Sequence, residues 1–109
     1  MDKKTLEVMA TKAFDNIKGA RIELFDAVEK SIEAKTNLEA DKAAALSSGK
    51  FDGKNAEIRE AQAREFLKNR YNDLETMEAR ERSARYNFDL ASLDVDTVKT
   101  LLRIAELTE

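Results

Sequence analysis

Apolar side chains recur at alternating steps of three and four along the first part of the chain. One series, spaced by seven residues, is Leu6, Ala13, Ala20, Ala27 and Ala34, and a second, offset by four, is Ala10, Ile17, Leu24, Ser31, Leu38 and Ala45. Such heptads are typical of a long helix that packs lengthwise against another helix. The pattern predicts a first helix over about residues 3–46, followed by a turn at residues 47–54.

The predicted turn contains serines and glycines in place of the periodic apolar residues. Gly49 suits the position just after a helix C-terminus, and Asp52 or Asn55 can cap a following helix. Phe51 is the one aromatic residue in this polar segment, and two interpretations stay open for it: the ring folds back over the end of the helices, or it contacts a partner. Gly49, Phe51 and Gly53 are therefore the residues expected to characterise the turn.

Beyond the turn the heptad pattern resumes and keeps one phase. Its two series are Ala56, Ala63, Arg70, Met77, Ala84, Ala91, Val98 and Ala105, and Glu60, Leu67, Leu74, Glu81, Phe88, Val95 and Leu102. The unbroken phase predicts a second helix over about residues 55–107. Because Ser92 or Asp94 can cap a helix, a break near residues 92–94 that begins a short C-terminal third helix stays an alternative.

Two long helices joined by one turn predict an all-α fold, a coiled-coil-like antiparallel helical hairpin that forms a single domain over residues 1–109. Folding the chain at the turn pairs the two heptad patterns and brings Leu38 beside Ala63 and Leu6 beside Val95. In this register the second helix extends past the start of the first, so that the segment beyond about residue 98 has no partner helix.

Apolar side chains outside the heptad series predict that the hairpin self-associates as a dimer or higher oligomer, because a two-helix hairpin has one internal contact line. Arg70 and Glu81 are charged residues within the heptad series, and they can pass a small neighbour or pair with a charge on another subunit. The residues predicted for an oligomer or partner interface are Phe14, Phe25, Ile32, Leu90, Leu93, Val98, Leu101, Leu102 and Ile104.

The composition narrows the classes of function. The chain has no histidine and no cysteine, which removes imidazole and thiolate nucleophiles, disulfides and the usual zinc and haem ligands. Carboxylates remain, and the spacings Glu57-x-x-Glu60 and Glu75-x-x-Glu78 are typical of helical nucleotide pyrophosphatases that bind magnesium, which we keep as a weaker alternative. Our interpretation is that these glutamates belong to solvated helix surfaces, and we expect no enzyme, no cofactor and no metal.

Charge and hydropathy bear on partners and location. The net charge is −3, and the arginines of the second helix are interleaved with glutamates, so we expect no direct binding to nucleic acid. Glu7 and Lys12 interrupt the first apolar stretch, and no apolar run approaches the roughly 20 residues of a membrane span. We therefore expect a cytoplasmic protein with no membrane contact, whose partners are its own copies or another protein.

Two resemblances add to this picture. The stretch from Gly53 to Gln62, GKNAEIREAQ, followed by a long Arg/Glu/Ala/Leu helix and the ending LLRIAEL, resembles small helical proteins of temperate bacteriophages. That resemblance implies a phage or prophage origin and a bacterial host cytoplasm, with no activity to carry over. Phe51-Asp52-Gly53 in the turn and Tyr71-x-x-x-Glu75 resemble the secreted Trp-x-Gly helical hairpins, although phenylalanine stands where that family has tryptophan.

Taken together, the pattern and the resemblances lead to one expected function. It is that of a non-catalytic, phage-type helical scaffold or adaptor that acts through self-association and protein–protein contacts. A secreted helical hairpin and a carboxylate-metal nucleotide pyrophosphatase remain the alternatives.

Overall fold

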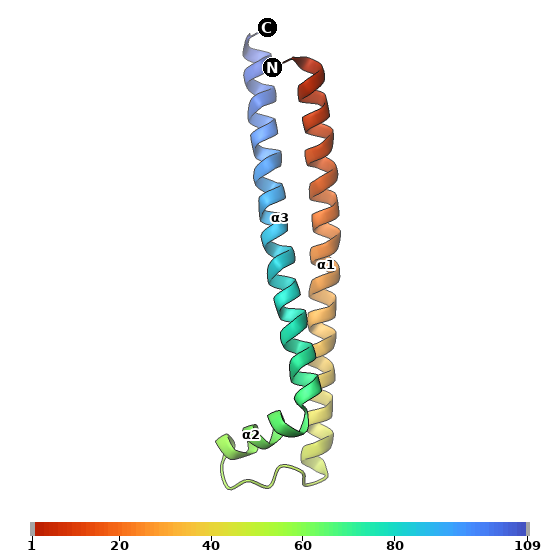
Figure 1. The fold of residues 1–109 in the computed structure, drawn as a ribbon, viewed down its shortest axis with the longest axis vertical. Coiled ribbons are helices and arrows are strands. Elements are labelled where there is room, and N and C mark those ends of the chain that lie inside the picture. The colour runs from red at the N-terminus through yellow and green to blue at the C-terminus, as the bar shows by residue number, and fades with distance from the viewer. Residues whose placement is uncertain (1, 109) are drawn as a thin grey trace. The chain divides into compact units, whose positions relative to one another are not determined.

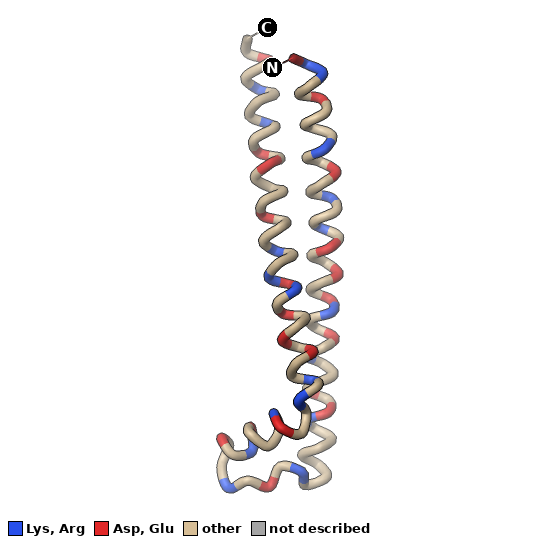
Figure 2. Tube along the Cα trace, in the orientation of Figure 1, with Lys and Arg blue, Asp and Glu red and all other residues tan. Residues whose placement is uncertain are grey.

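The computed structural model describes residues 2–108 and contains three α-helices in that range (Figure 1). Helix α1 spans Lys3–Ser47, α2 spans Ala56–Phe66 and α3 spans Lys68–Thr108. Helices α1 and α3 run antiparallel, and charged residues of both signs occur along all three helices (Figure 2). The prediction of an all-α antiparallel hairpin is confirmed.

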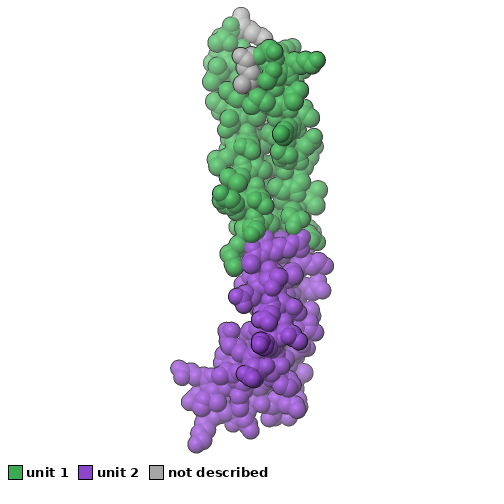
Figure 3. Space-filling model, viewed as in Figure 1, with its two compact units in different colours: residues 1–26, 82–109 green, residues 27–81 purple. Residues whose placement is uncertain are grey.

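The chain divides into two compact units, each containing a part of α1 and a part of α3 (Figure 3). Of the described residues, 2–26 and 82–108 belong to unit 1, and Ala27–Glu81 forms unit 2, which also holds α2. Unit 1 is built from two helix segments and unit 2 from three.

In unit 1, α1 and α3 pack through small and β-branched side chains. Ala13, Val95 and Val98 form the buried cluster, and Met9, Ala10, Ile17 and Leu102 pack against it. Every one of these residues except Met9 belongs to the predicted heptad series. Small alanines on one helix opposite valines on the other let the two backbones approach closely, which is how an interdigitated core is filled without voids.

In unit 2, small side chains of α1 are again buried between the helices, and a second buried cluster lies near the turn. Ala27, Ala34 and Leu38 of α1 are buried. Nearer the turn, Ala45 of α1 and Ala63 of α2 enclose Phe51, with Leu67 packed against them. The alanine-rich contact line predicted for α1 is therefore confirmed by burial in each unit.

The connection after α1 begins with a glycine in the left-handed conformation. Gly49 has φ +73°, its N–H donates to the Leu46 carbonyl at 3.1 Å, and the Lys50 N–H donates to the Ala45 carbonyl at 3.0 Å. This pair of hydrogen bonds is the Schellman arrangement that ends a helix. The predicted role of Gly49 is confirmed, and the helix cap that follows is Asn55, whose side-chain oxygen accepts from the Ile58 N–H at 2.9 Å.

The break in the second half of the chain lies at Leu67, not at residues 92–94. Leu67 has φ −107° and ψ 29° and separates α2 from α3. Residues 92–94 are helical, and the Ser92 hydroxyl donates back to the Phe88 carbonyl at 3.0 Å instead of capping a new helix. The third helix is therefore α2, beside the turn. Heptads record which side of a helix is apolar and not the direction of its axis, so a bend that keeps the phase leaves no trace in the pattern.

The register of the hairpin is also different from the predicted one. Ala63 shares its buried cluster with Ala45, seven residues further along α1 than the predicted Leu38. Leu6 lines the same cavity as Leu102 and Ala105, so α1 covers the segment beyond residue 98 that was expected to extend past it. A shift of one heptad returns every residue to an equivalent position, and the pattern alone cannot distinguish the two registers.

Candidate interaction surface

Most of the residues predicted for an interface are exposed on the helices. Among the described residues, the exposed members of that set are Phe14, Phe25, Ile32, Leu90, Leu93 and Ile104. All but Ile32 belong to unit 1. Unit 1 therefore has apolar side chains on the outside of both of its helix segments, and these are the residues available to a partner.

Two of the predicted interface residues belong to the core instead. Val98 is only 4% exposed and lies in the buried cluster with Ala13 and Val95, and Leu102 packs against that cluster. Both belong to the heptad series, so α1 already covers them. Their assignment to an intermolecular interface was wrong because the predicted register left this part of α3 without a partner helix. Leu101 is half-buried, so it belongs neither to the exposed residues nor to the core.

A shallow cavity of about 560 Å³ lies at the end of unit 1 where the first turns of α1 meet the last turns of α3. Leu6, Leu101 and Ile104 provide its apolar wall, and Lys3 and Glu106 stand at its polar edge. An apolar wall with a charged rim is typical of a contact surface for a protein. The cavity connects the exposed side of α3 to the start of α1.

Sequence reasoning missed several exposed apolar residues, which are Val8, Ile22, Leu46, Ile58, Phe66 and Leu107. The signal that could have found them is the same one used for the predicted set, namely an apolar side chain at a position outside the two heptad series. Isolated apolar residues on a surface are common, and this signal becomes informative only where several of them share one side of one helix.

The second group of predicted residues, the turn, is fixed by contacts with α2. The Gly53 N–H donates to the Gln62 side-chain oxygen at 3.0 Å, and the Gly53 carbonyl accepts from Arg59 Nη1 at 3.0 Å. Gln62 also donates through Nε2 to Asp52 at 2.9 Å. A Cβ atom on residue 53 would lie 2.5 Å from Cγ2 of Ile58, so this close approach requires glycine.

The ring of Phe51 folds back over the end of the helices, which is the first of the two interpretations that the sequence left open. Its side chain is 8% exposed and lies in the cluster with Ala45 and Ala63. The ring meets that of Phe66 edge to face, with 6.1 Å between centroids and 76° between planes. Phe51 thus folds back and fastens the turn to α2, and it is not available to a partner.

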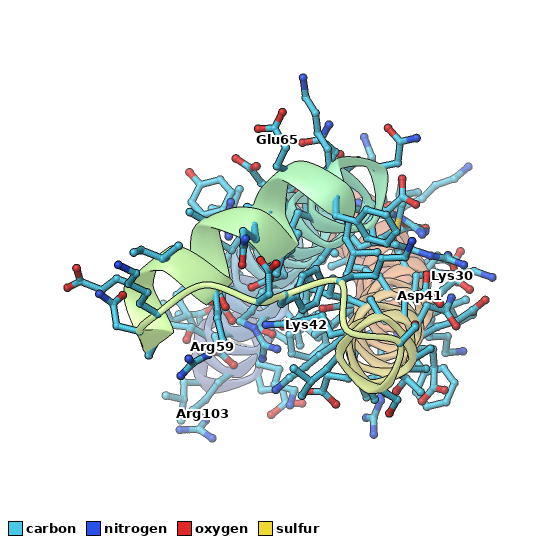
Figure 4. The ribbon with its side chains drawn as sticks, turned by 90° about the horizontal axis from the view of Figure 1, so that it is seen from below. Lys30, Asp41, Lys42, Arg59, Glu65 and Arg103 are labelled. Atoms are coloured by element: carbon cyan, nitrogen blue, oxygen red, sulfur yellow. The ribbon has the colours of Figure 1, made fainter. Side chains whose placement is uncertain are left out.

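A polar network links α1, α2 and α3 within unit 2, beside the turn. Glu60 accepts from Lys42 Nζ at 3.2 Å and from the Tyr71 hydroxyl at 3.0 Å, and Arg64 Nε lies 3.6 Å from the same carboxylate. The Arg64 guanidinium stands 4.8 Å from the centre of the Tyr71 ring. Figure 4 views this end of the chain and shows Lys42 between α1 and α2.

The network changes the acidity of its members. The hydroxyl of Tyr71, and after it the ammonium of Lys42, lower the pKa of Glu60 from its ordinary value. Contact with Tyr71, followed by the hydrogen bond to Glu60, raises the pKa of Lys42. Both shifts favour the charged forms, so the network is an ion-paired brace for the turn and α2 and not an acid–base pair poised near neutral pH.

The structure also assigns a partner to Arg70. Arg70 Nε donates to Asp41 Oδ2 at 2.6 Å, within one chain. The sequence left two possibilities open for Arg70, passing a small neighbour or pairing with a charge on another subunit. The pairing with Asp41 shows that this heptad position is satisfied inside unit 2.

The paired carboxylates considered for metal chemistry are not gathered into a site. Glu60 is occupied by Lys42, Tyr71 and Arg64. Within residues 2–108, the structure brings no three carboxylates together as ligands for a metal ion. None of the described helices carries an apolar stretch long enough to cross a membrane.

The described residues thus include exposed apolar side chains on all three helices and a turn that is fastened to α2. The chain matches no protein-family model, no characterised protein and no solved structure.

Proposed function

We propose that this protein is a non-catalytic helical scaffold or adaptor that acts through self-association and contacts with other proteins. The observation that supports this proposal most directly is the exposure of Leu90, Leu93 and Ile104 on a helix whose inward positions, such as Val95, are already covered by α1. These side chains are not covered by α1 within unit 1. A partner helix that packs on this side of α3 would bury them.

The exposed side chains of α3 are large enough to stabilise an association when a partner covers them. Covering one leucine or isoleucine of this kind stabilises an association by roughly 1.5–3 kcal/mol when burial is complete. Leu93 is 61% exposed and Ile104 is 52% exposed, so a large part of that free energy is still available to a complex. Several such residues on one helix expose more contiguous apolar surface than the isolated leucines that are common on monomeric proteins.

The setting of the proposal is the bacterial cytoplasm of a phage or prophage host. It is supported by the resemblance of the segment from Gly53 to Gln62 to small phage helical proteins. In that setting the chain would hold its own copies together, or attach another protein to them, without transforming a substrate.

Two matched double variants test the proposal by sedimentation velocity. Leu93→Gln with Ile104→Gln removes two apolar side chains from α3 without adding charge. Ile22→Gln with Leu46→Gln makes the same chemical change at exposed positions of α1 that were not predicted for the interface. We expect the unmodified chain to sediment as an oligomer and the α3 variant to shift toward monomer with its helical circular dichroism retained. A chain that remains monomeric and retains no protein in affinity capture would contradict the proposal.

A further inference from the structure

Charge is distributed unevenly around the part of α3 that belongs to unit 1. From residue 82 to residue 108 this helix has eight charged residues, and successive side chains turn by about 100° around its axis. Seven of them fall on one side of the helix: Arg82, Arg85, Asp89, Asp96, Lys99, Arg103 and Glu106. In the remaining directions, the only charge in this segment is that of Asp94.

The side of the same segment next to these charges carries apolar and hydroxyl-bearing residues, and we call it the uncharged face. Its large members are Tyr86, Leu90, Leu93, Leu101 and Ile104, and all of them except the half-buried Leu101 are exposed. The side that packs on α1 is a different one, formed by Ala91, Val95 and Val98. Outward faces of helices normally carry the charged residues, so this face has the composition of a covered surface.

The spacing of the apolar residues on the uncharged face is symmetric about Thr97. Leu93 lies four residues before Thr97 and Leu101 four residues after it. Leu90 lies seven residues before and Ile104 seven residues after. Thr97 itself is exposed and lies in the middle of the face. An unrelated partner would not require this symmetry.

A symmetric face of this kind fits a second copy of the same chain. In a two-fold contact, residue i of one copy meets residue j of the other and the reverse also holds. With the two helices antiparallel and the axis at Thr97, Leu90 meets Ile104 of the second copy. In the same way Leu93 meets Leu101 of the second copy.

Asp94, the single charged residue at the edge of the uncharged face, distinguishes the two directions in which the copies could pair. Asp94 lies three residues before Thr97, and Thr100 lies three residues after it. The antiparallel pairing places the Asp94 carboxylate opposite the hydroxyl-bearing Thr100 of the second copy. A parallel pairing in register would place Asp94 opposite Asp94, and two like charges at one contact disfavour that arrangement.

The available area is sufficient for a specific contact. Covering one side chain of this size removes on the order of 100 Å² of apolar surface. Five such side chains from each copy together give about 1,000 Å², which is the lower bound for a specific protein–protein interface. The contact is thus of the size expected for a dimer that forms and dissociates with concentration.

We propose that the uncharged face of α3 forms an antiparallel two-fold contact with the same face of a second copy, centred on Thr97. This inference rests on the proposed function, because it names the surface through which the self-association takes place. It makes Leu90, Leu93, Leu101 and Ile104 the principal contacts between copies.

Because the chain has no cysteine, single cysteines can report this geometry directly. The test variant is Thr97→Cys and the matched control is Thr11→Cys, an exposed threonine on α1. A second test mixes Leu90→Cys carrying an affinity tag with untagged Ile104→Cys. Each sample is oxidised under mild conditions and resolved without reductant, and a reduced portion is sedimented to record its association.

We expect Thr97→Cys to form covalent dimers at concentrations where Thr11→Cys forms none. We also expect Leu90→Cys to link to Ile104→Cys but not to itself, because its own counterpart lies about 21 Å away at 1.5 Å per residue. Self-linking of Leu90→Cys as efficient as the mixed product would overturn the antiparallel arrangement. Association without preferential linking at Thr97 would overturn the inference and leave the proposed function standing. A monomer at every concentration would overturn the inference, and it would also contradict the proposed function if the chain retains no other protein in affinity capture.

Discussion

Arg70 of α3 donates to Asp41 of α1 at 2.6 Å and joins the two helices of unit 2 across a heptad position that would ordinarily be apolar. Both side chains remain about 40% exposed, at 42% and 40%. Solvent therefore screens the pair, and it stabilises the fold far less than a buried pair would.

The first prediction concerns this pair. A double-mutant cycle with Arg70→Ala and Asp41→Ala, followed by urea unfolding, should give a coupling free energy of about 0.2–1 kcal/mol. Arg70→Leu should be tolerated or stabilising, because it restores an apolar residue to the heptad position. A coupling well above that range would show that the pair is shielded from solvent by a contact absent from a single chain.

Glycine positions provide the second prediction. Gly53→Ala should destabilise the protein by about 1–3 kcal/mol, because the new Cβ would lie 2.5 Å from the branched side chain of Ile58. Gly19→Ala is the matched control, since nothing lies within 4 Å of its added Cβ and the residue is inside α1. That variant should raise the free energy of unfolding by about 0.5–1 kcal/mol. Equal effects of the two changes in chemical denaturation would contradict the tight contact at Gly53.

Phe51 is the third test. Phe51→Ala should cost about 3 kcal/mol because it removes a buried aromatic ring from the cluster of Ala45 and Ala63. Hydrogen exchange should accelerate first in α2 and in the connection before it. Phe66→Leu keeps an apolar side chain at the more exposed partner of the ring pair and should cost less. Unchanged exchange in α2 after Phe51→Ala would mean that the ring does not hold the turn.

The fourth prediction is a pH dependence. The pKa of Glu60 is lowered in the folded protein, so its contribution to stability is fully present above its ordinary value of 4.5 and is lost as the pH falls through the lower folded value. The pKa of Asp2 is lowered in the same sense by the Thr5 N–H at 2.7 Å. The thermal midpoint should therefore fall between pH 5 and pH 2, and Glu60→Gln should flatten that fall. An identical slope in the variant would contradict the role of the network.

The contact lines of the hairpin could be predicted from the sequence, whereas its register could not. Ala13 and Val95 lie at heptad positions and are buried, as the pattern indicates. A shift of one heptad preserves every such position, so the choice between registers depends on the connection and on α2. The bend at Leu67 was equally invisible, because the chain changes direction there without changing phase.

The heptad pattern correctly predicted which residues of the candidate surface are exposed. It did not predict which members of the proposed interface are buried in the core. Leu90, Leu93 and Ile104 lie outside the heptad series and are exposed, as predicted. Val98 was misassigned because the wrong register removed its partner helix. The position of Phe51 depends on its packing against α2. The sequence pattern did not indicate that α2 is a separate helix with its own direction.

Sedimentation equilibrium of the unmodified chain at neutral pH, over a wide range of concentrations, tests the central claim most directly. We expect an apparent mass that rises with concentration from that of the 12.3 kDa chain toward a dimer or a higher oligomer. A single species of 12.3 kDa throughout the range would contradict it, because Leu90, Leu93 and Ile104 would then remain exposed to water with no copy of the chain to cover them.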